Sequence, residues 1–230
     1  SGRSGGGARK ACGGEVNGRS GVRSGTMLRN CEQEGGVPAD CRQVGYLMLL
    51  TRPQELGDFQ QLMELWHRLG LADARWLTIA EIGDQVPALN REDILGATFC
   101  PSDGIASPDA VTMGYAGAAR RAGARFREGV EVTGIDVRAG RVSGVSTSAG
   151  EIPTRVGFDC AGPWAKAVGR LAVGDVPVDP YRRPSWPTDT TPDTGRRPPM
   201  PGDVTTIVSF QPHGDGTLDP SDTAPSNLVP

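Results

Sequence analysis

The amino-acid sequence predicts a mixed α/β fold (α+β), and three observations support this prediction. A short, continuous apolar run at residues 45–50 has the length and composition of a buried strand. Apolar residues repeat at helical spacing in residues 53–70 and again in residues 108–122. Residues 130–158 alternate apolar and polar side chains in three stretches separated by Ala-Gly turns, which is typical of an antiparallel β-meander.

The composition limits how much of the chain can fold. The 230 residues suffice for one large domain or two small ones. Hydrophobic residues make up 37%, below the usual share, and Gly and Pro contribute 33 and 19 residues. The net charge of −3 does not favour a nucleic-acid partner. We therefore expect a globular middle with less ordered ends.

The cysteines and histidines argue against a metal site. The five cysteines include no C-x-x-C pair, and there are only two histidines. A scattered, odd set of cysteines fits a reducing compartment, so we predict a cytoplasmic location. No apolar run approaches the roughly 20 residues that cross a bilayer, and residues 1–30 lack the apolar core of a signal peptide. No membrane partner is expected, and a start at Ser1 suggests a fragment or a processed product.

The two ends of the chain carry the least structural signal. Residues 1–30 contain nine glycines and six basic residues against one acid. Composition favours a disordered basic arm there, and the alternative is an anion-binding loop at residues 1–9. Each glycine within residues 11–27 costs a helix about 1 kcal/mol, so we do not expect a helix there. Residues 184–230 hold ten of the 19 prolines and predict a loose tail, with at most a short strand at 204–210.

Local sequence signals mark the ends of the helices in the middle segment. Pro53 suits the first turn of one helix, and Gly70 suits a left-handed cap after its end. Thr78 and Glu81 have the spacing of a capping box for a short second helix. For the third helix, Ser107 is the expected N-cap, Pro108 fills the first position and Gly123 follows the end.

A series of motifs over this middle segment resembles one enzyme family. The motifs are Asp103-Gly104 followed by Ser107-Pro108, Gly140-Arg-Val-Ser-Gly-Val145, Gly150-Glu-Ile152, Cys160-Ala-Gly-Pro-Trp-Ala165 and Pro177-Val-Asp-Pro-Tyr-Arg-Arg183. Their order resembles the D-amino acid oxidase and sarcosine oxidase superfamily of FAD-dependent oxidoreductases. Each motif alone is weakly specific, whereas their order over more than a hundred residues carries the resemblance.

The resemblance implies a domain organisation. It implies a partial Rossmann-like FAD-binding domain with a β-meander, and part of an antiparallel-sheet substrate domain. Residues 1–40 would form a glycine-rich, FAD-proximal loop and a degenerate helix. Residues 41–97 would belong to the substrate domain, residues 98–176 to the FAD-binding domain, and residues 177–230 to the return into the substrate domain and a proline-rich tail.

The chain departs from the family pattern at its start. The first βαβ unit should carry a G-x-G-x-x-G fingerprint and an acid that binds the ribose. The nearest string, Gly2 to Gly7, follows no strand and does not match. The family segment that closes over the flavin ring is also missing. The chain therefore resembles an internal fragment.

The resemblance implies FAD contacts from six residues: Ser4, Gly5, Gly6, Val132, Ala161 and Gly162. A glycine at the end of a parallel strand would let the backbone approach the cofactor, and the following helix N-terminus suits phosphate. Without the resemblance, Gly162 reads as an ordinary strand-to-helix turn, and Val132 as a core valine.

The expected substrate residues are Tyr46 and Arg182. Tyr46 lies on a strand that could floor the pocket, although a core tyrosine is an equal alternative. Arginine suits a substrate carboxylate because it donates two parallel hydrogen bonds, and the other candidate cations are Arg9, Arg42, Arg52 and Arg183. No catalytic residue is identified.

Three functional hypotheses follow. The first is an FAD-dependent oxidoreductase that oxidises the C–N bond of a small-molecule amine or amino acid by hydride transfer to flavin. The alternative is a truncated or degenerate non-catalytic fragment that cannot bind FAD alone. The third is a binding protein that holds anions with its basic amino-terminal arm.

Overall fold

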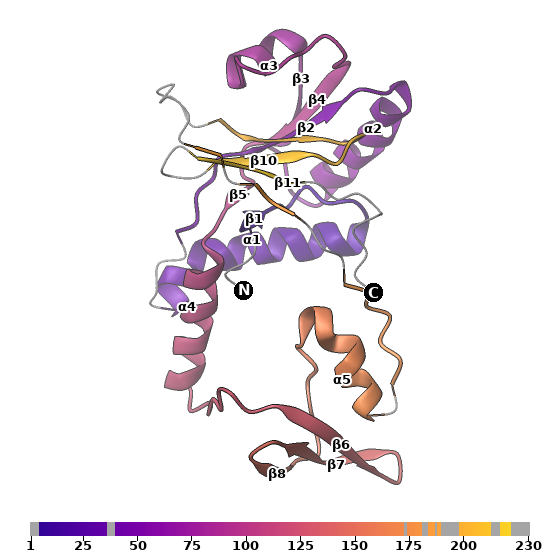
Figure 1. The fold of residues 1–230 in the computed structure, drawn as a ribbon. Helices are drawn as coiled ribbons and strands as arrows, with labels where there is room; N and C mark the ends of the chain where they lie inside the picture. Colours follow the sequence, from indigo (N-terminus) through magenta and orange to yellow (C-terminus); the bar gives the residue numbers. More distant parts are fainter. Residues whose placement is uncertain are drawn as a thin grey trace. The chain divides into compact units, whose positions relative to one another are not determined.

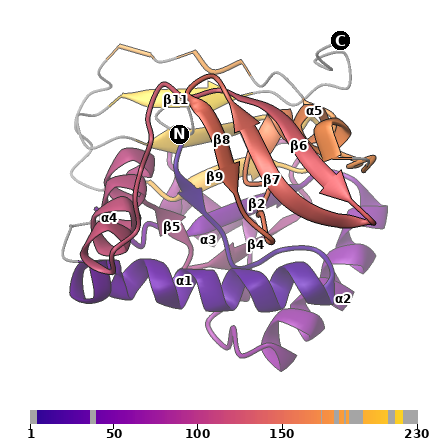
Figure 2. The ribbon, with the colours of Figure 1, turned by 90° about the horizontal axis from the view of Figure 1, so that it is seen from below.

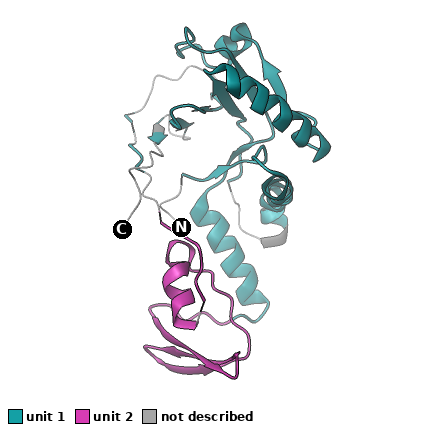
Figure 3. Ribbon diagram, turned by 90° about the vertical axis from the view of Figure 1, so that its right-hand side faces the viewer, with its two compact units in different colours: residues 1–124, 184–223 teal, residues 125–183, 224–230 magenta. Residues whose placement is uncertain are grey.

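The structure is a computed structural model with two compact units, and it confirms the mixed α/β fold (Figure 1). It describes residues 5–35, 40–172, 174–180, 184–186, 188–189, 198–212 and 217–221. One unit comprises residues 1–124 and 184–223, and the other comprises residues 125–183 and 224–230 (Figure 3). The four-part division inferred from the family resemblance stays a prediction.

A six-stranded sheet organises the first unit. Its strand order is β11-β10-β9-β2-β4-β3, and every neighbouring pair is antiparallel except β2 and β9. The strands are β2 (Tyr46–Leu50), β3 (Arg75–Leu77), β4 (Gly96–Cys100), β9 (Met200–Asp203), β10 (Ser209–Pro212) and β11 (Leu218–Ser221). Strand β2 confirms the buried strand predicted at residues 45–50.

Strands β9 to β11 correct the prediction of a loose tail for the residues described there. The expected strand at 204–210 is also wrong, because residues 204–206 form the turn between β9 and β10. Strand β9 pairs along the edge of β2, where the Met200 N–H donates to Gly45 O at 3.0 Å and the Val204 N–H donates to Leu49 O at 3.2 Å. Backbone pairing with an existing strand orders this segment despite its low apolar content.

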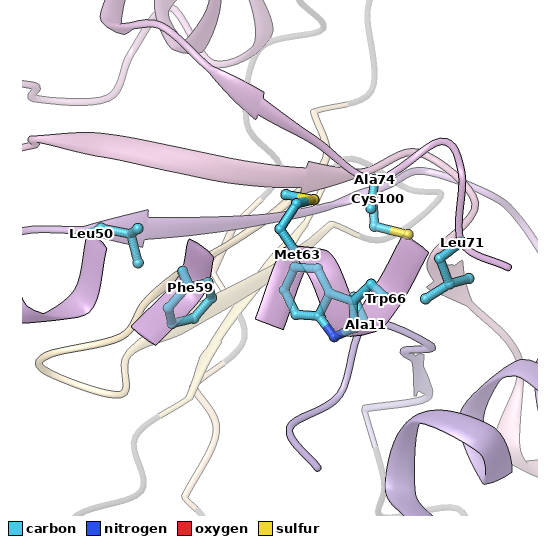
Figure 4. Packing of buried hydrophobic residues seen from close by; sticks show 8 residues of the cluster. All are labelled: Ala11, Leu50, Phe59, Met63, Trp66, Leu71, Ala74 and Cys100. Atoms are coloured by element: carbon cyan, nitrogen blue, oxygen red, sulfur yellow. The ribbon is translucent and has the colours of Figure 1, made fainter. Parts of the chain in front are cut away.

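Two apolar clusters cover the two faces of β2. Leu50 packs with Phe59, Met63 and Trp66 of helix α2 (Pro53–Arg68), as Figure 4 shows. Leu47 and Leu49 point to the opposite face and join the cluster that contains Ile82 of helix α3 (Ile79–Gln85), together with Leu77, Ile94, Ala97 and Phe99. The alternation of β2 therefore separates a face toward α2 from a face toward α3.

The three helices predicted in the middle segment are confirmed. Helix α2 is followed by Gly70, which has a φ of 90° as expected for a left-handed residue. The Glu81 N–H donates to Thr78 Oγ1 at 3.3 Å, and the Thr78 N–H donates to Glu81 Oε2 at 2.8 Å, so the capping box of α3 is complete. Helix α4 (Pro108–Arg121) is capped by Ser107 Oγ, which accepts a hydrogen bond from the Ala110 N–H at 3.2 Å.

Helix α1 (Glu15–Gly35) corrects the prediction that residues 11–27 form no helix. Its glycines lie against other parts of the chain: Gly18 faces the Leu69 side chain, Gly21 the Lys10 backbone and Gly25 the Lys10 side chain. A Cβ at residue 21 would lie 3.1 Å from Lys10 Cα, so glycine permits this close packing. The propensity cost is thus offset by tertiary contacts.

Figure 2 shows α1 beside α4, with which it is in contact. Lys10 is buried, and Arg19 forms an ion pair with Glu15 at 2.7 Å on the exposed side of α1. Within residues 5–30 the expectation of a disordered basic arm is therefore wrong. No helix among the described residues is long and apolar enough to cross a bilayer.

The second unit contains the predicted β-meander. Strands β6 (Val132–Arg138), β7 (Arg141–Thr147) and β8 (Gly150–Pro153) form an antiparallel sheet in sequence order. They are followed by a 3-10 turn, η1 (Gly162–Trp164), and by helix α5 (Ala165–Ala172), which contacts β6.

Two details of the second unit were predicted wrongly. The last stretch of the meander, expected to extend to residue 158, ends at Pro153. Residues 154–161 contain no strand, so Gly162 does not lie at the end of a parallel strand as the resemblance implied. The Thr154 hydroxyl donates to Val156 O at 2.9 Å, and the Val156 N–H donates back to Thr154 Oγ1 at 3.4 Å. These local bonds turn the chain away from β7.

Glu55 connects the start of α2 to the turn after β9. Its carboxylate accepts hydrogen bonds from the Thr51 N–H at 2.9 Å, the Arg52 N–H at 3.1 Å and the Thr205 hydroxyl at 2.6 Å. Burial opposes ionisation, but these three donors outweigh it and hold the pKa of Glu55 below its usual value. The ionised carboxylate therefore stabilises the fold above its unfolded-state pKa, and this stabilisation is lost as the pH falls through the lowered pKa.

We expect Glu55→Gln to lower the free energy of unfolding by about 1–2 kcal/mol at pH 7. The difference from the wild type should shrink as the pH falls through the lowered pKa of Glu55, because the wild-type carboxyl then also becomes neutral. Urea unfolding at pH 7 and at a pH below this pKa measures both effects. Glu64→Gln, at an exposed position of the same helix, is the control and should change little at either pH. A loss for Glu55→Gln that is independent of pH would contradict this account.

Candidate functional site

The segment from Gly5 to Cys12 lies against one face of the sheet in the first unit. Strand β1 (Gly7–Ala8) pairs antiparallel with β5 (Gly104–Ile105), and Gly6 O accepts a hydrogen bond from the Ala106 N–H at 2.9 Å. A Cβ at Gly7 would lie 3.8 Å from the methyl group of Met200. Because Met200 is paired with Tyr46 across parallel strands, both side chains point to the same face of the sheet.

The Arg9 guanidinium lies over Tyr46 on this face. Its Cζ is 5.3 Å from the centroid of the Tyr46 ring, and its Nη1 is 4.0 Å from Met48 Sδ. Tyr46 is half-buried and Arg9 is exposed. Gly202 flanks the ring, and a Cβ there would lie 3.4 Å from the Tyr46 hydroxyl oxygen. The arrangement presents a cation above an aromatic and thioether floor.

This geometry suits the recognition of a carboxylate beside an apolar group. A guanidinium has five N–H donors, so Arg9 keeps donors for a carboxylate beside its contacts with the Tyr46 ring and Met48 Sδ. Arg42, another candidate cation, already binds Asp40 through Nε at 2.7 Å and Nη2 at 2.8 Å. Arg182 and Arg183 lie outside the described residues, so Arg182 as a substrate residue stays a prediction.

The glycines predicted near the flavin are packed tightly against protein. Gly6 has a φ of 78°, and a Cβ there would overlap the Ala106 carbonyl oxygen and lie 3.2 Å from Pro108 Cδ. A Cβ at Gly5 would lie 2.5 Å from Gln211 Oε1. The protein's own packing therefore requires glycine at position 6, whereas the Gln211 side chain at position 5 can move aside. Their FAD contacts stay predictions, and Ser4 lies outside the described residues.

The remaining predicted FAD residues, Val132, Ala161 and Gly162, belong to the second unit. Gly162 has a φ of 57°, and no protein atom lies within 4 Å of the position that a Cβ would take. With respect to the described residues, the backbone is therefore open at the turn into η1 and α5, which fits the close approach of a cofactor. Val132 is 39% exposed at the start of an edge strand, so it is not the core valine of the alternative interpretation. The cofactor contacts of all three residues stay predictions.

Sequence reasoning gave no role to Asp103, which the structure places beneath the Arg9 segment. Asp103 is 0% exposed, and its Oδ1 accepts a hydrogen bond from the Lys10 N–H at 2.7 Å. Its Oδ2 has no hydrogen-bond partner among the described residues. Burial raises the pKa of Asp103 above its usual value, and the hydrogen bond from the Lys10 N–H opposes this shift. The available signal was the acid of the Asp-Gly motif, three residues after the buried strand β4.

The chain belongs to the DAO family of FAD-dependent oxidoreductases, whose sequence model matches residues 1–221. Members of this family oxidise amines or amino acids, and their cofactor is FAD.

Curated relatives are similar over part of their length. The chain is 36% identical over 157 residues to human mitochondrial sarcosine dehydrogenase, which covers 66% of the chain and 17% of that protein. It is 28% identical over 170 residues to rat mitochondrial dimethylglycine dehydrogenase, which covers 73% of the chain and 19% of that protein. The chain thus spans less than a fifth of the length of these relatives. These two relatives are mitochondrial proteins, and the cytoplasmic location of this chain stays a prediction.

Solved structures match nearly the whole chain. L-proline dehydrogenase from P. horikoshii superposes with a TM-score of 0.87 at 26% identity, over 99% of this chain and 62% of that one. Glycine oxidase from Geobacillus kaustophilus superposes with a TM-score of 0.75 at 18% identity, over 97% and 60%, and supports the fold alone.

Proposed function

We propose that this chain forms the substrate-binding sheet and part of the FAD site of an enzyme that oxidises the C–N bond of a small amino acid. The observation that carries the proposal is the Arg9 guanidinium, 5.3 Å above the ring of Tyr46. FAD, when bound, would accept the hydride from the carbon next to the nitrogen. The chain's own residues bind and orient the substrate.

In this proposal Arg9 binds the substrate carboxylate, and Tyr46 and Met48 contact its apolar part. A carboxylate held by two parallel hydrogen bonds fixes the position of the neighbouring carbon, and this orientation is the contribution of the chain to the reaction. The names of the similar proteins support an amino acid with an alkylated nitrogen, because sarcosine, dimethylglycine and L-proline share that feature and a carboxylate.

The test uses the protein expressed from its complete reading frame. The purified protein should show flavin absorbance, and sarcosine, dimethylglycine or L-proline should reduce the flavin without oxygen. Arg9→Ala should raise KM for the active substrate by about 10- to 100-fold, since a charge-assisted hydrogen bond contributes about 1.5–3 kcal/mol. Arg9→Lys should restore part of the loss, because lysine keeps the charge without the fork of donors.

A matched control is available in Arg75. It also stacks on an aromatic ring, with its Cζ 5.6 Å from the Phe99 centroid. Phe99 points to the α3-facing side of the sheet, because it pairs with Leu47. Arg75→Ala should leave KM unchanged. A KM that Arg9→Ala does not alter would overturn the assignment of Arg9.

One observation favours the alternative of a non-catalytic fragment. The sequence contains no G-x-G-x-x-G string, the motif that binds the pyrophosphate of a dinucleotide in Rossmann-like folds. The alternative predicts that residues 1–230 do not bind FAD and unfold with low cooperativity. Titration of this chain with FAD, followed by flavin fluorescence, tests it, and micromolar affinity would exclude it.

A further inference from the structure

Asp103 makes an unusually long-range contact for a buried carboxylate. Its Oδ1 accepts the Lys10 N–H at 2.7 Å across 93 residues of sequence, and its side chain is fully buried. The Oδ2 atom has no hydrogen-bond partner among the described residues. A buried carboxyl group with an unsatisfied oxygen is unfavourable for folding. The hydrogen bond from the Lys10 N–H is the long-range contact that this side chain makes.

The backbone of Asp103 is fixed as firmly as its side chain. The Asp103 N–H donates to Cys100 O at 3.1 Å, and Asp103 O accepts the Gly45 N–H at 2.9 Å. The carbonyl contact holds the start of β2, one residue before Tyr46. Asp103 therefore binds the neighbours of both members of the cation–ring pair: Lys10 follows Arg9, and Gly45 precedes Tyr46.

Among the described residues, two other long-range backbone anchors flank the segment around Arg9. Strand β1 is two residues long and ends at Ala8, immediately before Arg9. On the other side, the Trp66 indole N–H donates to Cys12 O at 2.9 Å. The Asp103 bond to Lys10 lies between these two anchors and next to Arg9, so it limits how far the Arg9 backbone can move.

We infer that Asp103 is a positioning residue that holds Arg9 above Tyr46 and thereby sets the affinity for the substrate carboxylate. The functional half of this inference rests on the proposed role of Arg9. The structural half rests only on the Lys10–Asp103 hydrogen bond. Because the contact to Gly45 uses the main chain, substitution of the side chain should release Arg9 and leave Tyr46 in place.

The test measures loop mobility and kinetics separately. Hydrogen exchange of a peptide containing Lys10 should become about tenfold faster in Asp103→Ala. Exchange should stay close to the wild-type rate in Asp103→Asn, whose Oδ1 still accepts the N–H. Should the alanine variant not fold, Asp103→Ser removes the same contact, because serine is too short to reach Lys10. Thr98→Val, at a buried polar residue of β4, controls for the loss of a buried polar group and should leave exchange at Lys10 unchanged.

In the enzyme expressed from its complete reading frame, Asp103→Ala should raise KM about tenfold with little change in kcat, and Asp103→Asn should restore KM. In an Arg9→Ala background, Asp103→Ala should add nothing to KM, because it acts through Arg9. The inference would be overturned if the two substitutions had additive effects on KM, or if Asp103→Ala did not change the rate of hydrogen exchange at Lys10. An Arg9→Ala variant with normal KM would instead refute the proposed role of Arg9, and the exchange result would still decide whether Asp103 holds the segment.

Discussion

Replacing Trp66 with alanine is expected to lower the free energy of unfolding by about 4 kcal/mol. Trp66 is 2% exposed and packs edge-to-face on Phe59, with ring centroids 6.1 Å apart and an interplanar angle of 80°. Its removal leaves a cavity in the cluster that joins α2 to the sheet (Figure 4). Urea denaturation followed by circular dichroism measures the loss.

The indole N–H adds a second contribution, because it donates to Cys12 O at 2.9 Å and fixes the segment that follows Arg9. Trp66→Phe keeps most of the apolar bulk and loses this bond, so it should cost about 1–2 kcal/mol. Trp164, which is 71% exposed, is the control, and its replacement by alanine should change stability by about 0.5 kcal/mol or less. Equal costs for the Trp66 and Trp164 alanine variants would contradict the packing argument.

The elements predicted correctly from the sequence are those with local causes. The capping box of Thr78 and Glu81 and the Ser107-Pro108 start act within one helical turn. The meander likewise follows from alternation and from turns at positive φ, such as Gly140 with a φ of 73°. These signals do not depend on what the rest of the chain does.

The errors arose where distant segments decide the structure. Strand β9 is ordered by β2, about 150 residues earlier, and the apolar content of its own segment gives no sign of it. Helix α1 differs from the prediction because the propensity cost of glycine applies to an isolated helix, whereas Gly18, Gly21 and Gly25 lie on one face against Leu69 and Lys10. Their spacing of three and four residues was the available signal.

The candidate site was predictable only in part. Tyr46 was placed correctly on a strand of the sheet, and Arg9 was one of several arginines considered. Their pairing depends on the register of β1 with β5 and of β9 with β2, which the sequence does not specify. Asp103 was visible only as part of a motif, because its contact with Lys10 joins segments 93 residues apart.

Replacing Gly104 with alanine should cost about 3 kcal/mol and loosen the Arg9 segment. A Cβ at this position would overlap the carbonyl oxygen of Arg42. That oxygen cannot move freely, because it accepts the Ile105 N–H at 2.9 Å while the Arg42 N–H donates to Ile105 O at 2.8 Å. Relief of the overlap therefore requires β5 to shift, and β1 pairs directly with β5 at Ala8 and Gly104.

Gly83 provides the matched comparison for Gly104. A Cβ at Gly83 would also overlap another group, but this group is the guanidinium of Arg91, at the end of a flexible side chain. Arg91 can adopt another rotamer, so Gly83→Ala should change stability by about 1 kcal/mol or less. Urea denaturation of both variants measures the difference in stability. Hydrogen exchange at Lys10 measures whether the Arg9 segment becomes more mobile. If Gly104→Ala left exchange at Lys10 unchanged while destabilising the protein, the pairing of β1 with β5 would not be what holds Arg9 over the sheet.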